Sequence, residues 1–389
     1  MRHREWVAPT SKMQFIALAF CLSFLAPAAW SGDSVLYSVG TAGDTSGRHL
    51  PLWKTEIFAV DQETVKQRLI FSDAGADFIL LPGGNGTRGA IAAAGGRVFS
   101  VGMDRKVYSV GGFAGPWAIY ELSTDGSNKA RKLFDIEWEP NTSNNFANLF
   151  VSPSGSKIGH TNYLVLEKAA YLFIHDTATG RLLQKSDISG NLLAEATAIG
   201  WMPHDKTVFF TCALAGDEDD TSWATPNSPV GSYLLRDDYN VAVRLALERE
   251  MHPKIPGLQA DPEQPAVVIG GLPDGRFIVH DIQQGPASAH PGTYLYTLDL
   301  ARKTKKIFPM TVDSQTGSFR LSNSGRELAL TVMQRENEGP KKTSADTVGL
   351  WVFDLESASQ KKLLSFTIKQ DGPPWVSLIG WLDDCEACR

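Results

Sequence analysis

Two turn signatures alternate along this chain, and their alternation constrains its fold more than any other feature. In the first signature, an apolar segment enters a tight turn rich in Pro, Gly, Asp, Asn or Ser, and a second apolar segment follows. Copies lie at residues 92–96, 151–155, 201–205, 271–275 and 321–325, with a degenerate sixth at 381–384. Gly adopts positive φ angles easily, and Asp, Asn and Ser bond their own backbone, so these compositions predict turns.

In the second signature, an apolar segment with aromatic and β-branched residues near every second position ends in Asp, and a short polar turn follows. Clear copies are residues 57–61, 172–176, 295–299 and 350–354, whereas 119–123 ends in Ser and 232–235 is the poorest. Such period-two patterns predict β-strands. The signatures recur about every 50 to 70 residues, which is the spacing of four-stranded propeller blades with their loops.

The two ends of the chain indicate how the repeats close. Residues 35–39, 57–61 and 65–71 predict a first blade that lacks its innermost strand, and residues 375–381 predict an innermost strand without a blade. Pairing them removes two open sheet edges. The sequence therefore predicts an all-β fold, a β-propeller of six four-stranded antiparallel blades closed by the C-terminal strand joining the N-terminal blade. An open array, or a blade count wrong by one, is the alternative.

Residues 1–31 have the composition of an export signal. Arg2, Arg4 and Lys12 form a positive start, residues 13–25 form an uncharged apolar core, and residues 26–31 offer small residues at the positions that a signal peptidase reads. Because the core is short for a membrane span, we expect a cleaved signal peptide over 1–31 rather than an anchor. A single propeller domain over 32–389 without a transmembrane segment would then reside in the periplasm or outside the cell.

Cys385 and Cys388 lie close together at the C-terminal end of the sequence. In an oxidising compartment they form either a local disulfide or a redox pair. Neighbouring acidic residues disfavour the thiolate, so we expect a disulfide or inert thiols. No cofactor and no metal are expected, because Arg389 stands where a c-type haem site requires His, and zinc lacks further ligands nearby.

Several of these segments resemble the repeats of the TolB-like family of six-bladed propellers, which are also described as WD40-like repeats. The segments are 152–155 and 272–275, each followed by an apolar strand, together with 171–176, 179–181 and 294–299. The resemblance covers essentially all of residues 32–389 and implies the fold. It leaves the function open, because the same repeat serves scaffolds, peptidase gates and enzymes. We expect no counterpart here of the N-terminal α/β domain that precedes the propeller in members of this family.

A meander of this kind places both kinds of signature turn on one face and all other connections on the opposite face. These other connections are long: 41–54, 103–116, 213–230, 281–291 and 333–347 within blades, and 72–88, 136–145 and 248–264 between blades. Long loops on a rigid scaffold commonly carry binding sites. We therefore predict a binding surface on this loop face. Its candidate residues are Trp53, Phe113, Trp117, Trp138, Trp223, His49, His252 and His290.

Aromatic residues of this kind either anchor a partner or pack the loops onto the blades. No catalytic motif stands out, so the first hypothesis is an exported, monomeric binding or scaffold module whose loop face contacts a protein or peptide. The net charge of −6 argues against nucleic acid as a partner. A module with a purely structural role is a further interpretation.

The alternative is an enzyme of the lactonase, lyase or hydrolase type, acting on a small molecule or carbohydrate at the mouth of the central channel. It requires that at least three of six residues converge: His49, His252, His290, Asp44, Asp281 and Glu195. Three other histidines, His160, His175 and His280, lie in or at the ends of predicted strands, and we expect them to be structural.

Overall fold

The structure is a computed structural model, and the described part of the chain is almost entirely β-structure. It comprises residues 34–42, 53–74, 76–80, 90–106, 116–137, 145–164, 167, 169–187, 196–204, 206–212, 231–235, 242–244, 259–260, 267–284, 292–299, 304–309, 315–335, 345–369 and 375–382. The chain divides into two compact units, residues 1–31 and 32–389, and all described residues belong to the second.

The described strands follow one another along the chain. In chain order they are β1 (Ser34–Ala42), β2 (Trp53–Asp61), β3 (Gln67–Ser72), β4 (Phe78–Leu80), β5 (Ile91–Ala94), β6 (Arg97–Asp104), β7 (Ala118–Leu122), β8 (Ala130–Asp135), β9 (Asn145–Val151), β10 (Lys157–Leu164), β11 (Ala169–Asp176), β12 (Leu182–Asp187), β13 (Ala196–Trp201), β14 (Val208–Cys212), β15 (Gly231–Leu235), β16 (Ala242–Arg244), β17 (Gln259–Ala260), β18 (Val267–Gly271), β19 (Phe277–Gln284), β20 (Gly292–Asp299), β21 (Thr304–Pro309), β22 (Gln315–Leu321), β23 (Glu327–Arg335), β24 (Ala345–Asp354), β25 (Gln360–Lys369) and β26 (Trp375–Leu382). In the described residues, no helix is long and apolar enough to cross a membrane.

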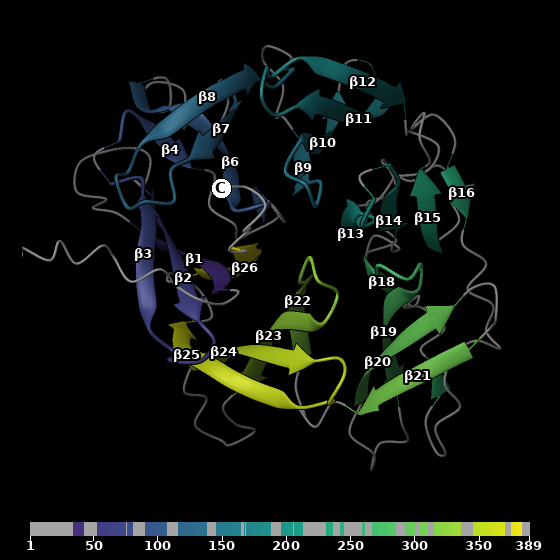
Figure 1. Cartoon of the computed structure of the whole chain (residues 1–389). Coiled ribbons are helices and arrows are strands. Elements are labelled where there is room, and N and C mark those ends of the chain that lie inside the picture. Colours follow the sequence, from purple (N-terminus) through teal and green to yellow (C-terminus); the bar gives the residue numbers. More distant parts are fainter. Residues whose placement is uncertain are drawn as a thin grey trace, which may run out of the picture. The chain divides into compact units, whose positions relative to one another are not determined.

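These strands form six antiparallel sheets arranged as the blades of a β-propeller (Figure 1). The first sheet has the order β26-β1-β2-β3, and the third, fourth and sixth are four-stranded meanders that begin at β9, β13 and β22. The innermost strands contact one another from sheet to sheet, and the series β5, β9, β13, β18, β22, β26 returns to β5.

The second and fifth sheets have five strands, so the expectation of four strands in every blade is wrong for them. In each, two short strands share the innermost position: β4 and β5 both pair with β6, and β17 and β18 both pair with β19. Residues 81–90, which separate β4 from β5, are rich in Gly, and residues 261–266, which separate β17 from β18, contain two prolines. Both residue types weaken a strand interior. The predicted loops 72–88 and 248–264 therefore each contain a short strand, β4 or β17.

The C-terminal strand lies where the sequence predicted it. β26 pairs with β1 from Ser34 opposite Leu382 to Gly40 opposite Trp375, with a bulge at Ile379. Because the first sheet takes its innermost strand from the end of the chain, the two ends of the described domain are held in one hydrogen-bonded ladder.

Apolar side chains fill the spaces between neighbouring sheets. Leu36 and Ile91 share one buried cluster between the first and second sheets, and Tyr37 and Leu350 share another between the sixth and first. Each fully buried aliphatic or aromatic side chain contributes about 1.5–3 kcal/mol. The sheets are therefore held together face to face by their cores.

The second signature is explained by hydrogen bonds within its turn. The Asp176 carboxylate accepts hydrogen bonds from the Thr179 N–H (2.8 Å) and hydroxyl (2.7 Å). Asp354 bonds Ser357 in the same way (2.6 and 2.8 Å), and Asp61 has an equivalent turn. These bonds lower the pKa of each carboxyl, because they favour the charged form. The strand-ending Asp is thus a turn cap.

The first signature closes its turn through Ser and Gly. In the third sheet, the Gly155 N–H donates to the Ser152 carbonyl (2.7 Å), and the Ser152 hydroxyl accepts the Lys157 N–H (3.1 Å). Gly155 has φ +70°, a conformation that Gly adopts without strain. Residues 322–327 repeat both hydrogen bonds. Both signatures therefore specify turns, as predicted.

Candidate functional site

The two sides of the sheets differ in how the chain crosses them. On the side of the signature turns, the connections range from two residues (95–96) to seven (123–129). On the other side, Cys212 ends β14 and Gly231 begins β15, so eighteen residues, 213–230, connect these strands. We call the first the turn side and the second the loop side. The described ends of the strands at the loop side form the candidate site.

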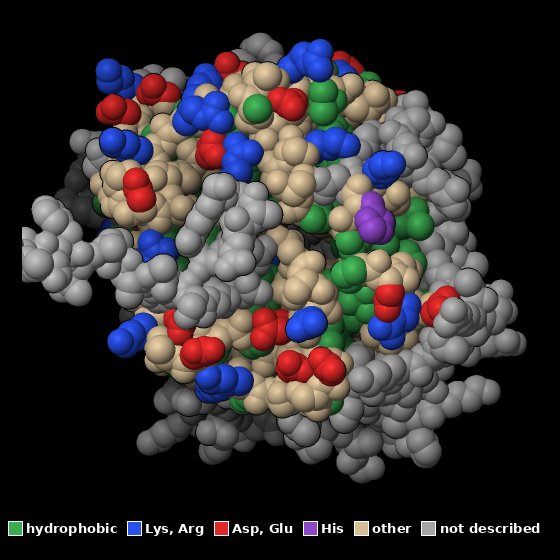
Figure 2. All heavy atoms as spheres, in the orientation of Figure 1, with side chains coloured by type: hydrophobic (Ala, Val, Ile, Leu, Met, Phe, Trp, Pro, Cys, Tyr) green, Lys and Arg blue, Asp and Glu red, His purple; other side chains and the backbone are tan. Residues whose placement is uncertain are grey.

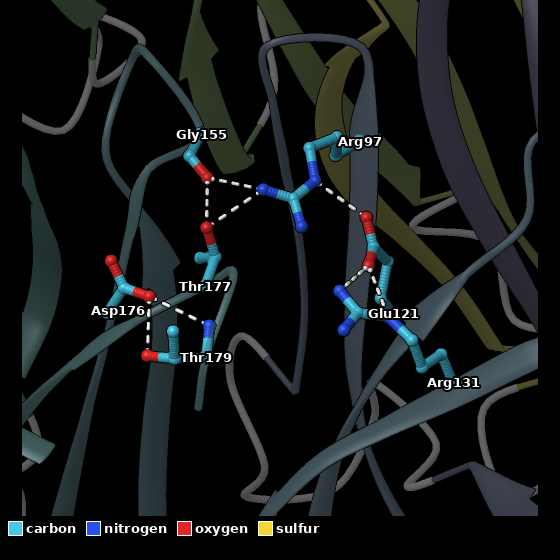
Figure 3. A network of polar contacts seen from close by, with 7 residues as sticks. All are labelled: Arg97, Glu121, Arg131, Gly155, Asp176, Thr177 and Thr179. Atoms are coloured by element: carbon cyan, nitrogen blue, oxygen red, sulfur yellow. Dashed lines mark hydrogen bonds and ion pairs between the residues drawn. The ribbon is translucent and has the colours of Figure 1, made fainter. Parts of the chain in front are cut away.

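Polar contacts link neighbouring sheets at the turn side (Figure 3). Arg97 on β6 donates from Nη1 to the Gly155 carbonyl and the Thr177 hydroxyl of the third sheet, both at 2.8 Å. Its Nε donates to Glu121 at 2.6 Å, and Glu121 also pairs with Arg131 at 2.6 Å. The guanidinium thus has a counter-ion in its own sheet and a carbonyl and a hydroxyl as acceptors in the next, which is the arrangement of a structural clamp.

Two of the predicted site residues lie in the described part. Trp53 is the first residue of β2, at the loop side. Trp117 immediately precedes β7 and is 5% exposed, within the apolar cluster between the second and third sheets. Its indole packs in the core, which is the packing interpretation for this residue. The others lie outside the described residues: Phe113, Trp138, Trp223, His49, His252, His290, Cys385 and Cys388.

The residues required by the enzyme interpretation are also mostly outside the described part. Asp281 lies on β19, but Asp44 and Glu195 fall outside, together with the three histidines. Among the described residues, no group of three or more His, Cys, Asp or Glu side chains is placed to hold a metal ion. The convergence of these residues stays a prediction.

A buried carboxylate at the loop side joins the first two sheets. Asp73 is fully buried and follows β3. Its Oδ1 accepts the Thr55 N–H of β2 (2.8 Å), and its Oδ2 accepts the Leu80 N–H of β4 (3.1 Å). Burial raises the pKa of Asp73, and the two N–H bonds and the positive charge of Arg105 oppose this shift.

Arg105, which follows β6 of the second sheet, binds the same connection between β3 and β4. Its guanidinium donates to the carbonyls of Ala76 (2.7 Å) and Asp73 (2.6 Å). Within the part of the chain that the structure describes, the side-chain oxygen of Thr55, which is 1% exposed, has no hydrogen-bond partner. Sequence reasoning missed this junction, because it assigned residues 72–88 to an irregular loop.

Two histidines form an aromatic stack between the second and third sheets. The His175 ring lies 3.8 Å from the Phe134 ring and 5.5 Å from the His160 ring, measured between centroids. His160 also stacks on Phe173 at 4.8 Å. Burial, with the neighbouring His175, lowers the pKa of His160 to about 3. His175 is buried as well and contacts the Gly180 carbonyl. Both are structural, as predicted, and neutral near pH 7.

Most innermost strands contain a β-bulge, which the sequence analysis did not predict. In five sheets the innermost strand carries a bulge against its neighbour. In the sixth sheet, the Ser318 N–H released by the bulge bonds the Thr331 hydroxyl at 2.9 Å. Bulges turn a strand locally and release backbone groups from the ladder. The bulge in the sixth sheet is thus compensated by a side chain of the neighbouring strand.

Comparison with known proteins identifies no family and finds only distant structural similarity. No protein-family model and no curated protein matches the chain. Among solved structures, TolB from Acinetobacter baumannii is 12% identical, with 91% of this chain and 67% of that chain covered and a TM-score of 0.48. A putative TolB from Agrobacterium tumefaciens is 12% identical, covering 90% and 99% with a TM-score of 0.47. The propeller domain of the Trilobed protease from Pyrococcus furiosus is 10% identical, covering 87% and 93% with a TM-score of 0.43.

Proposed function

We propose that the chain is a closed six-bladed propeller that binds a protein or peptide through its loop side. The observation that carries this proposal is the difference between the two sides. Short turns with internal caps and the Arg97 clamp occupy the turn side, whereas the longest connection within a sheet, 213–230, leaves from the loop side. A rigid scaffold that carries long connections on one side is the usual arrangement of a binding module.

The proposal includes export and a monomeric state. Residues 1–31 have the composition of a signal peptide, and the boundary between the two compact units falls between Ser31 and Gly32. Mass spectrometry of the protein recovered from the native envelope tests the cleavage. A mature N-terminus near residue 32 is expected, and an intact N-terminus contradicts export by cleavage. Light scattering of the purified chain gives its oligomeric state, and a dimer would contradict the monomer.

Site-specific photo-crosslinking tests the use of the loop side. A photoreactive phenylalanine derivative replaces Phe113 or Trp223 in the loops, and matched variants carry it at Ala178 or Glu356, which are exposed at the turn side. After irradiation in native envelopes, the loop variants should give one discrete adduct that excess unlabelled protein suppresses. The turn variants should give none.

Equal labelling from both sides would contradict a loop-side partner. Absence of any adduct, at normal expression and with a cooperative melting transition, would contradict a protein partner altogether.

A further inference from the structure

The innermost strands carry almost no charge. Their described sequences contain neither Asp, Glu nor Lys, and a single Arg, Arg320 on β22. In the face shown in Figure 2, hydrophobic side chains gather near β13 and β18. Charged groups are depleted from inner strands because removing them from water is costly. A positive charge at this place therefore requires an explanation.

Arg320 departs from the pattern of its repeat. The equivalent positions of the other five innermost strands are occupied by small or apolar residues: Gly380, Ala92, Phe150, Gly200 and Gly270. Phe319 and Leu321, which flank Arg320 in β22, pack in the neighbouring apolar cluster, and Arg320 is not part of that cluster. The packing of the innermost strands therefore does not explain why an arginine occupies this position.

Part of the guanidinium has a structural role. Its Nε donates to the Ile379 carbonyl at 3.0 Å, and its Nη1 donates to the Phe319 carbonyl at 2.8 Å. Ile379 is the bulged residue of β26, so its carbonyl is outside the regular ladder. The Trp381 indole N–H donates to the Arg320 carbonyl at 2.8 Å. These bonds join the sixth sheet to the first.

The charge itself has no counter-ion among the described residues. Arg97 and Arg276 pair with Glu121 and Asp274, but no carboxylate of the described part pairs with Arg320, and its Nη2 makes no hydrogen bond there. Burial lowers the pKa of its guanidinium, although part of the side chain stays exposed. Carbonyl oxygens accept the hydrogen bonds but leave the positive charge uncompensated.

Guanidinium groups bind carboxylates and phosphates with paired N–H donors. We propose that Arg320 binds a small oxyanion, a phosphate or a carboxylate, where the innermost strands β22 and β26 meet. This site is separate from the loop side and does not depend on a protein partner.

Calorimetric titration with inorganic phosphate, at constant ionic strength set with NaCl, tests the proposal, and a parallel titration with acetate distinguishes the two anion classes. We expect saturable binding of one anion per chain. Arg320→Gln should weaken it about tenfold or more, the loss of about 1.4 kcal/mol, and Arg320→Lys should weaken it less. Arg276→Gln is the matched control, because Arg276 already has a carboxylate partner. The affinity of this variant for phosphate should equal that of the wild-type chain.

Several results would overturn the proposal. One is no saturable binding to the wild-type chain, and another is equal binding by Arg320→Gln. Stabilisation of all variants alike by high phosphate would show only the general effect of such salts. If a chain ending at Leu382 binds phosphate while the full chain does not, carboxylates of residues 383–389 hold the guanidinium and no external anion does.

A second readout avoids dependence on the folding of the Arg320 variants. Wild-type protein labelled with 5-fluorotryptophan reports on Trp381, whose indole bonds the Arg320 backbone, and Trp381→Phe assigns its ¹⁹F resonance. Phosphate should shift this resonance with the same midpoint as the calorimetric titration. A resonance that does not move while others do would place the bound anion elsewhere and contradict the proposal.

Discussion

A disulfide between β1 and β26 would test the closure of the propeller directly. Ser38 and Ser377 lie directly opposite each other in the ladder. Opposite residues of an antiparallel pair have Cα atoms about 4.5–5.5 Å apart, within the range of about 4.4–6.8 Å that disulfides span. In a background without the native cysteines, Ser38→Cys/Ser377→Cys should therefore form a disulfide in the folded protein.

The expected gain in stability follows from the length of chain that the bond encloses. The two positions are 377 − 38 = 339 residues apart. The chain-entropy model then gives a loss of about 19 cal/mol/K in the unfolded state, or about 6 kcal/mol at 25 °C, as an upper value. Measured gains are typically about 2–4 kcal/mol. Urea unfolding followed by tryptophan fluorescence, with and without reductant, should show a higher midpoint for the oxidised form.

The control uses the neighbouring register position. Val376 pairs with Val39, so its side chain points to the opposite face of the sheet from Ser38. Ser38→Cys/Val376→Cys should keep two free thiols under the same oxidising conditions. If the control forms the bond and the test pair does not, the register is wrong. If the test pair keeps its thiols in protein that melts cooperatively, the closure is wrong.

Three further predictions concern single side chains. Asp176→Ala should cost about 1 kcal/mol at neutral pH. This difference should vanish in acid, because a carboxyl with a lowered pKa stabilises the fold above its ordinary value of 3.8 and loses that effect as the pH falls through the native pKa. His160→Gln should move acid unfolding to lower pH, since a buried imidazole with its pKa lowered from 6.5 to about 3 costs stability as the pH falls through that interval. Gly159→Ala should cost about 1–3 kcal/mol, because the new Cβ would lie 2.4 Å from Cζ of Phe150. Urea midpoints measured across pH, beside the wild type, check all three, and unchanged midpoints contradict them.

The sequence predicts best those parts of the fold whose interacting residues are close together in the chain. The turn at Asp176 needs only Thr179, three residues later, whose N–H and hydroxyl donate the two hydrogen bonds that close it. The closing strand at residues 375–381 was recognisable because the first blade lacked a strand. Both inferences used local pattern and a count of strands, and the ladder between β1 and β26 agrees with them.

The features that the sequence did not predict depend on contacts between sheets. Asp73 lies in a polar, glycine-containing segment that is typical of a loop, yet it is buried because Thr55 and Leu80 donate to its carboxylate from two different sheets. The division of the innermost strands and their bulges likewise depend on the neighbouring strand. The composition of a short segment does not reveal partners that come from distant parts of the chain.

These two classes of residue suggest where function should be sought in a repeat protein. Residues that repeat at equivalent positions are explained by what every blade needs, as Asp176 and Asp354 are explained by their turns. A residue that departs from its equivalents at a cost in desolvation lacks that explanation. Arg320 replaces a small or apolar residue at an inner edge and has no carboxylate partner in the described part of the chain. Arg97 differs from Arg320 in this respect, because it has a counter-ion in Glu121 and hydrogen-bond acceptors in the next sheet, which explain it as a clamp between sheets.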